Sequence, residues 1–181
     1  MRPRLLPLLA AAVSLAACRA PDRAPVDGSA ADGTADSTAD SAFAAVQTRG
    51  ATVMGVDQYT SAHVFEDLPD GGRIVLDRAD STDTAAVRTI RAHMRTIADA
   101  FARGDFAAPG LVHDQVVPGT SVMAARRASI EYAATDRPRG AEVRIRTTDS
   151  AAVRAVHAFL AFQRSDHRAA GHEAHGSAKH P

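Results

Sequence analysis

The chain has 181 residues, with 21 basic and 21 acidic side chains and a formal net charge of +0. This length predicts one ordinary domain once processed or disordered segments are set aside. The chain has no Trp, two Tyr and six Phe, so the large side chains that dominate core energetics are scarce. The balanced charge lacks the basic excess of nucleic-acid-binding proteins, and we expect no nucleic-acid partner.

The first 17 residues have the pattern of a secretory signal peptide. Arg2 and Arg4 supply a positive start, and residues 5–17 form an apolar run interrupted only by Pro7 and Ser14. This run is too short to span a bilayer as a stable helix. We therefore predict that residues 1–17 direct export.

The signal peptide ends at Leu15-Ala16-Ala17-Cys18, and this stretch resembles the lipobox of bacterial lipoproteins. The resemblance implies that Cys18 is lipidated and anchors the mature protein to a membrane. Cys18 is the only cysteine of the chain, so an internal disulfide framework is excluded. The alternative is an ordinary signal peptide with a chance cysteine. Arg19 stands where inner-membrane retention usually uses Asp, so we expect the cell envelope, on the periplasmic face of an outer membrane where the source has one.

Residues 18–50 are rich in Ala, Asp, Ser, Thr, Gly and Pro and contain a single Phe. Such a segment buries too little apolar surface to offset its ordering entropy, so we expect a lipidated, disordered tether. An alternative for its end is a short helix over residues 41–55. In that helix Phe43, Val46 and Val53 would dock on the domain.

Two similar stretches, Asp83-Thr-Ala-Ala-Val-Arg88 and Asp149-Ser-Ala-Ala-Val-Arg154, each predict the start of a helix with Asp as the N-cap. Apolar residues follow at helical spacing in both. They are Val87, Ile90, Met94, Ile97 and Phe101 in the first helix, and Val153, Val156 and Leu160 in the second.

A hairpin pattern precedes each predicted helix, over residues 63–76 and 130–145. Pro69 aligns with Pro138 at the turn, and alternating apolar residues flank it. We predict a duplicated β-β-α unit over residues 51–168, although chance similarity of Ala- and Val-rich helices is the alternative. The expected fold class is α+β, a four-stranded antiparallel sheet with two helices on one face.

The segment between the two units, residues 104–128, has no counterpart in the repeat and contains His113, Asp114 and Gln115. Loops on a rigid scaffold often carry function, so these three residues are a candidate ligand-binding loop. The favoured interpretation is a polar surface loop. A hydrolase using His113 and Asp114 is the least expected alternative, because no Gly-x-Ser-x-Gly or similar nucleophile motif accompanies them.

Eight histidines occur, four of them in the last fifteen residues. Neutral imidazoles bind Cu and Zn, and residues 169–181 are expected to be a disordered, His-rich tail. The favoured interpretation of these histidines is a solvated tail and half-buried side chains without metal. Methionines such as Met54, Met94 and Met123 would suit Cu(I), but Met94 fits the helix stripe and is better interpreted as core. The candidate metal ligands are His63, His113, His167, His172 and His175.

Four stretches are similar to an uncharacterised family of exported bacterial proteins. They are Gly55-Val-Asp-Gln-Tyr-Thr-Ser-Ala-His63, Pro69-Asp-Gly-Gly72, Val112-His-Asp114 and Phe162-Gln163. The resemblance spans most of residues 50–168 and implies no particular activity. We expect an envelope lipoprotein whose small domain binds or handles a transition metal. The alternatives are an interaction module for an envelope protein or small ligand, without metal, and an enzyme as the least expected.

Overall fold

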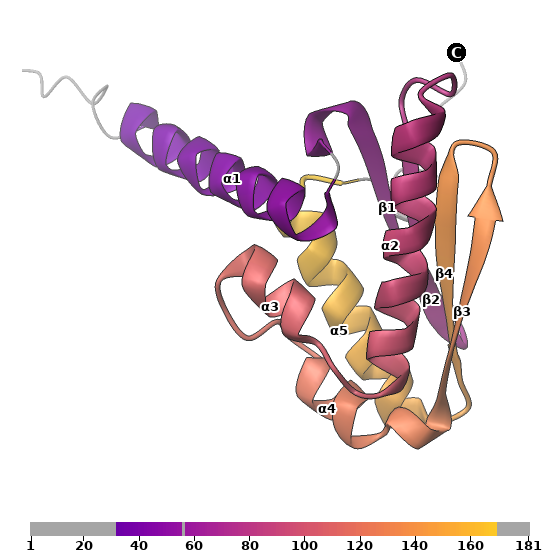
Figure 1. The fold of residues 1–181 in the computed structure, drawn as a ribbon. Helices are drawn as coiled ribbons and strands as arrows, with labels where there is room; N and C mark the ends of the chain where they lie inside the picture. Colours follow the sequence, from indigo (N-terminus) through magenta and orange to yellow (C-terminus); the bar gives the residue numbers. More distant parts are fainter. Residues whose placement is uncertain (1–31, 56, 170–181) are drawn as a thin grey trace, which may run out of the picture.

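The computed structural model describes residues 32–55 and 57–169, with side chains from residue 37 onward (Figure 1). Its first part consists of α1 (Asp32–Met54), the short 3-10 helix η1 (Gln58–Thr60), β1 (Ser61–Leu68), β2 (Gly71–Arg78) and α2 (Thr84–Ala102). Its second part consists of α3 (Ala107–His113), α4 (Thr120–Ala125), the 3-10 helix η2 (Arg127–Ser129), β3 (Ile130–Arg137), β4 (Gly140–Thr147) and α5 (Ser150–Asp166).

The four strands form one antiparallel sheet in the order β1-β2-β4-β3. The predicted α+β class and the four-stranded antiparallel sheet are confirmed. Both hairpins have eight-residue strands, and Ile74 of β2 lies opposite Val143 of β4 at the centre of the sheet. The β-β-α order therefore recurs with matching strand register, while its origin in a duplication stays a prediction.

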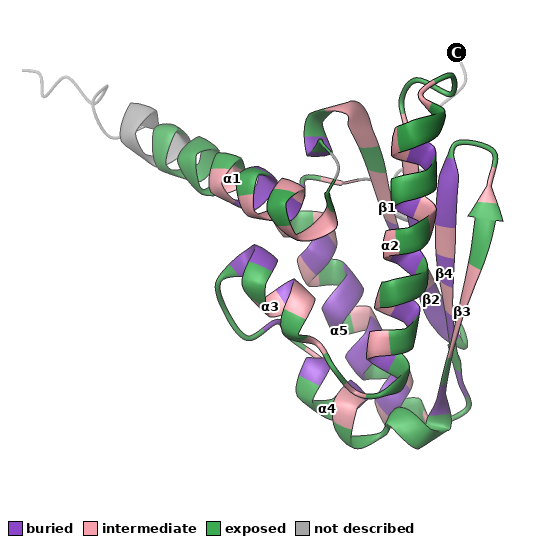
Figure 2. Cartoon of the chain, viewed as in Figure 1, coloured by how far each residue is buried: buried purple, intermediate pink, exposed green. Residues whose placement is uncertain are grey.

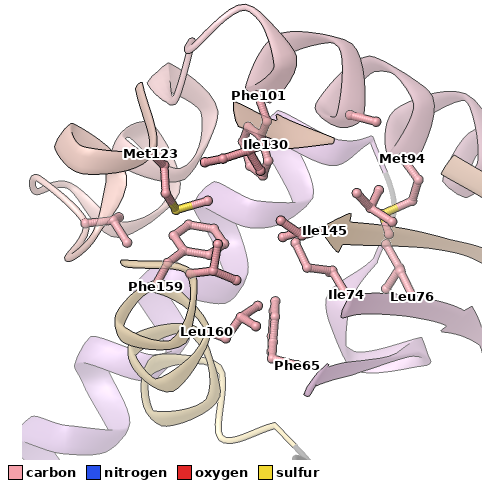
Figure 3. Packing of buried hydrophobic residues seen from close by; sticks show 14 of the residues in the cluster. Phe65, Ile74, Leu76, Met94, Phe101, Met123, Ile130, Ile145, Phe159 and Leu160 are labelled. Carbon is pink, nitrogen blue, oxygen red and sulfur yellow. The ribbon is translucent and has the colours of Figure 1, made fainter. Parts of the chain in front are cut away.

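Each long helix packs mainly on the hairpin of the other half. Helix α2 contacts β3 and β4, whereas α5 contacts β1 and β2. Ile90 from α2 and Leu160 from α5 join the same core cluster as Leu76, Val143 and Ile145 from the two central strands (Figure 3 shows part of this cluster). Because each half covers strands of the other, the two halves bury their apolar stripes only together.

Both expected N-caps are present. The Asp83 carboxylate accepts a hydrogen bond from the backbone amide of Ala86 at 3.0 Å. The Asp149 carboxylate accepts from Ala151 at 2.8 Å and Ala152 at 3.3 Å, and these contacts, with the Arg126 side chain, lower the pKa of Asp149. A carboxylate at this position satisfies exposed amides of the first turn and suits the helix dipole.

Helix α1 differs from the expected tether, because the chain is helical from Asp32 onward. Alanine is the strongest helix former, and the second half of the helix finds a packing surface. Val46 is buried, Arg49 Nε donates to the Val112 carbonyl at 2.6 Å, and the Arg168 guanidinium lies 4.5 Å from the Phe43 ring centroid. Figure 2 shows this change from exposed to buried positions along α1. No helix within the described residues is long and apolar enough to cross a membrane.

The segment over residues 104–128 is also more ordered than a surface loop. It forms α3 and α4, and Pro109, Val112 and Met123 are buried. A short helical turn, η2, follows α4 before the second hairpin. This segment therefore closes one end of the core and brings His113 against α5.

Candidate functional site: a histidine-lined cavity

A cavity of about 60 Å³ lies beside α2, bordered by the end of α1, strands β1 and β2, and α5. Its wall is mainly apolar, with Phe65, Phe101 and Phe159 among the lining residues. Because one water needs roughly 10–15 Å³ by this kind of measure, the cavity has room for a metal ion or a ligand of a few atoms. The polar side chains in its wall are His63, His93, Gln163 and His167.

Two of these histidines come from distant parts of the sequence. His63 lies on β1 opposite Leu76 and points to the core side of the sheet, while His167 caps the C-terminal end of α5, seven residues after Leu160. Their ring centroids are 5.0 Å apart, and the Phe65 ring lies 5.7 Å from each. The His167 side chain is buried.

His113 packs behind this pair, with its ring centroid 5.0 Å from that of His167. Its Nδ1 pairs with the Asp166 carboxylate, and its Nε2 lies 2.9 Å from Oε1 of Gln163. The ring is buried, so the favoured interpretation of His113 as part of a polar surface loop is wrong. The structure thus brings together three of the five predicted metal residues, His63, His113 and His167, although both nitrogens of His113 are already engaged.

The carboxylate that pairs with His113 is not the one that the hydrolase alternative requires. Asp166 of α5 pairs with His113, whereas Asp114 ends α3 in the left-handed conformation at φ 55° and is exposed. Neighbouring residues at a helix end point in different directions, so the His113 and Asp114 side chains diverge. The two residues therefore do not form the acid–base pair that this alternative needs.

Two buried imidazole nitrogens lack a hydrogen-bond partner in the described part of the chain, Nε2 of His93 and Nδ1 of His167. Burial lowers the pKa of His93 to about 4. Burial and the nearby His93 lower the pKa of His63 to about 4. Burial, followed by repulsion from His63 and His113, lowers the pKa of His167 to about 3, with Asp166 acting in the opposite direction. All three cavity imidazoles are therefore neutral at pH 7, and each ring has one nitrogen that carries no proton.

Within residues 32–55 and 57–169, no group of three or more His, Cys, Asp or Glu side chains is arranged to hold a metal ion. Cys18, His172 and His175, with the expected lipid anchor and tail, lie outside the described residues. A carboxylate-supported zinc site is thus not formed by the described part of the chain.

A second hollow of about 440 Å³ opens at the surface beside α1 and α3. All three residues of the predicted ligand-binding loop, His113, Asp114 and Gln115, line it together with Arg49 and Asp166. Its lining combines these polar and charged residues with the apolar Ala42, Ala45 and Val46, in contrast to the mainly apolar cavity. His113 contributes to this hollow and also contacts His167, which lines the cavity.

The predicted metal ligands did not include His93, and reasoning from the sequence also missed Gln163 and Asp166. Gln163 lies three residues after Leu160, and a polar residue in an apolar helical stripe is the signal that would have drawn attention to it. Asp166 carries no such signal, because it pairs with His113 from 53 residues away. His157 is not part of the site, since its Nε2 bonds to the Leu68 carbonyl at 3.0 Å.

No protein-family model matches this chain, and comparisons with curated proteins and with solved structures find no significant match. The similarity to an uncharacterised exported family therefore stays a prediction. The proposed function depends on the geometry of the histidine-lined cavity.

Proposed function

We propose that this protein is a lipid-anchored binding protein of the bacterial cell envelope, with the histidine-lined cavity as its ligand site. The observation that carries the proposal is the pair of unpartnered nitrogens on His93 and His167. Buried polar atoms are nearly always hydrogen-bonded, and one left unpaired costs about 1 to 3 kcal/mol. A small ligand or transition-metal ion that engages these atoms would recover that free energy.

The envelope location is supported by the signal-peptide pattern and the lipobox-like ending at Cys18. We expect the Cys18→Ser variant to incorporate no labelled fatty acid in a bacterial host and to leave the membrane fraction, because two or more acyl chains are needed for stable anchoring. Metabolic labelling with palmitate and membrane fractionation measure both effects. Equal labelling of the variant and the wild type would contradict lipidation at Cys18.

Ligand binding is tested by thermal unfolding in the presence of a defined set of probes: Cu(I), Ag(I), Cu(II), Zn(II), Ni(II), imidazole and phenol. A ligand at 100 times its Kd adds about 2.7 kcal/mol to the free energy of unfolding, a shift of several degrees in Tm. We expect at least one probe to stabilise the wild type and to stabilise His167→Leu less. His157→Leu is the matched control, because its ring lies outside the cavity and its response should equal that of the wild type.

A second candidate, an interaction module without metal, is favoured by the hollow lined by Arg49, Asp114 and Gln115. A probe that bound there would stabilise His167→Leu as well as the wild type and would lose its effect in Arg49→Ala. If none of the probes stabilised the wild type, the proposal that the cavity binds a ligand of this kind would be overturned.

A further inference from the structure

The chemistry of the cavity wall points to one class of ligand. Besides three imidazoles, the wall contains the thioethers of Met54 and Met94. Among the described residues no Asp or Glu lines the cavity, and the only cysteine of the chain is Cys18, far from it in sequence. The available donors are therefore neutral nitrogen and soft sulfur, without a compensating negative charge.

This donor set disfavours a divalent ion. Zn(II) usually takes three or four ligands from His, Cys, Asp and Glu, and the described residues offer no such group. A divalent ion held by neutral donors in an apolar wall would also keep its full double charge away from water, which is costly. A monovalent ion carries half that charge, and thioether donors favour Cu(I) among the biological metals.

The cavity wall also offers an imidazole nitrogen that no other group of the described residues occupies. An imidazole binds metal through a nitrogen that carries no proton. Nδ1 of His167 is buried without a hydrogen-bond partner in this part of the chain, whereas both nitrogens of His113 are hydrogen-bonded.

We propose that the cavity is a Cu(I) site, with the imidazoles of His63 and His167 and the thioether of Met54 as its ligands. This inference rests on the proposed function, that the cavity binds a ligand, and names the ligand. The two ring centroids are 5.0 Å apart, a separation that one ion can bridge at about 2.0 Å from a nitrogen of each ring once the rings rotate about their Cβ–Cγ bonds. Met94 is almost fully buried and serves the core, whereas Met54 is partly buried at the end of α1. The Met54 Sδ accepts a hydrogen bond from Gln58 Nε2 at 3.5 Å and keeps a second lone pair for a metal ion.

The test is an anaerobic competition titration with Cu(I) and the chromogenic chelator bicinchoninate. It uses the full chain with the substitutions His172→Ala, His175→Ala and His180→Ala, so that the tail imidazoles do not contribute to Cu(I) binding. We expect one Cu(I) per chain, with an affinity lowered at least about 100-fold in His63→Leu and His167→Leu and about 10-fold in Met54→Leu. X-ray absorption of the Cu(I) form should show a sulfur neighbour that is missing in Met54→Leu.

Two matched controls separate ligand loss from loss of the fold. Met123→Leu removes a buried thioether outside the cavity, and His157→Leu removes an imidazole outside it, so both should bind Cu(I) as the wild type does. Met54→Leu preserves side-chain volume, so this variant should stay folded. Its Cu(I) affinity can therefore be measured even where a histidine variant unfolds. Equal Cu(I) affinity in Met54→Leu, His63→Leu, His167→Leu and the parent chain would overturn this site.

The outcomes also distinguish this inference from the proposed function. If Zn(II), imidazole or phenol binds in a His167-dependent way and Cu(I) does not, the Cu(I) inference is wrong and the proposed cavity function stands. If no probe binds, both are wrong.

Discussion

Acidification from pH 7 to pH 4 is expected to destabilise this domain by several kcal/mol. The pKa values of His63, His93 and His167 in the folded protein, about 4, 4 and 3, lie below the ordinary histidine value of 6.5. Above pH 6.5 the rings are neutral in both the folded and unfolded states, so their contribution to stability is fully present. As the pH falls through 6.5 the unfolded chain binds protons first, and stability is lost progressively towards pH 4 and 3.

The size of this effect follows from the pKa differences. A difference of about 2.5 units corresponds to about 3 kcal/mol for one ring, and the three rings interact, so their contributions do not simply add. Even one such contribution is a large fraction of the free energy of unfolding of a typical folded domain, which is about 5 to 15 kcal/mol. Urea unfolding followed by circular dichroism at pH 7, 6, 5 and 4 measures the dependence.

Replacement of one cavity ring should flatten this pH dependence. We expect His93→Leu to lose less stability between pH 7 and pH 4 than the wild type, because the unfolded variant has one less proton to bind. His157→Leu is the control, since this ring is hydrogen-bonded to the Leu68 carbonyl and lies outside the cavity. An unchanged slope in His93→Leu would show that burial does not hold this ring neutral.

The substitution Gly119→Ala is expected to cost about 3 kcal/mol in the free energy of unfolding. Gly119 precedes α4 at φ +83°, where a side chain is strained, and its added Cβ would lie 2.1 Å from the backbone carbonyl oxygen of Ala155 on α5. The carbonyl belongs to a packed helix and has no room to move aside. The start of α4 must therefore shift away from α5, and we expect a fall in Tm of roughly 10 °C.

Gly110→Ala is the matched control for this prediction. Gly110 lies within α3, and its added Cβ would come no closer than 3.7 Å to a neighbour, the Gln115 carbonyl oxygen. Alanine is a better helix former than glycine, so this variant should be about 0.5 to 1 kcal/mol more stable than the wild type. A similar fall in Tm for both variants would refute the close contact between Gly119 and α5.

Local patterns in the sequence predicted the regular elements well. The caps at Asp83 and Asp149 and the hairpin turns after Leu68 and Arg137 depend on residues a few positions apart. Such short-range preferences can be recognised without knowing the fold. Among the alternating apolar residues of the two hairpins, Ile74 and Val143 lie opposite each other in the sheet.

The candidate site was predictable only in part. Histidine composition drew attention to His63, His113 and His167, and the structure brings their rings together. The sequence did not reveal that Asp166 and Gln163 occupy the nitrogens of His113, since those contacts join residues about fifty positions apart. Composition also favoured a tether where α1 is helical, because its packing against α3 is a long-range contact.

The sequence by itself thus determined the β-β-α order, the helix caps and the supply of imidazole and thioether groups, all of which depend on residue type and short spacing. Only the tertiary structure decided which imidazoles are buried, which lose their hydrogen-bond partners and which share a cavity. The physical reason is that burial and pairing depend on the crossing of α2 and α5 over each other's hairpins, and this arrangement exists only once the whole domain has folded.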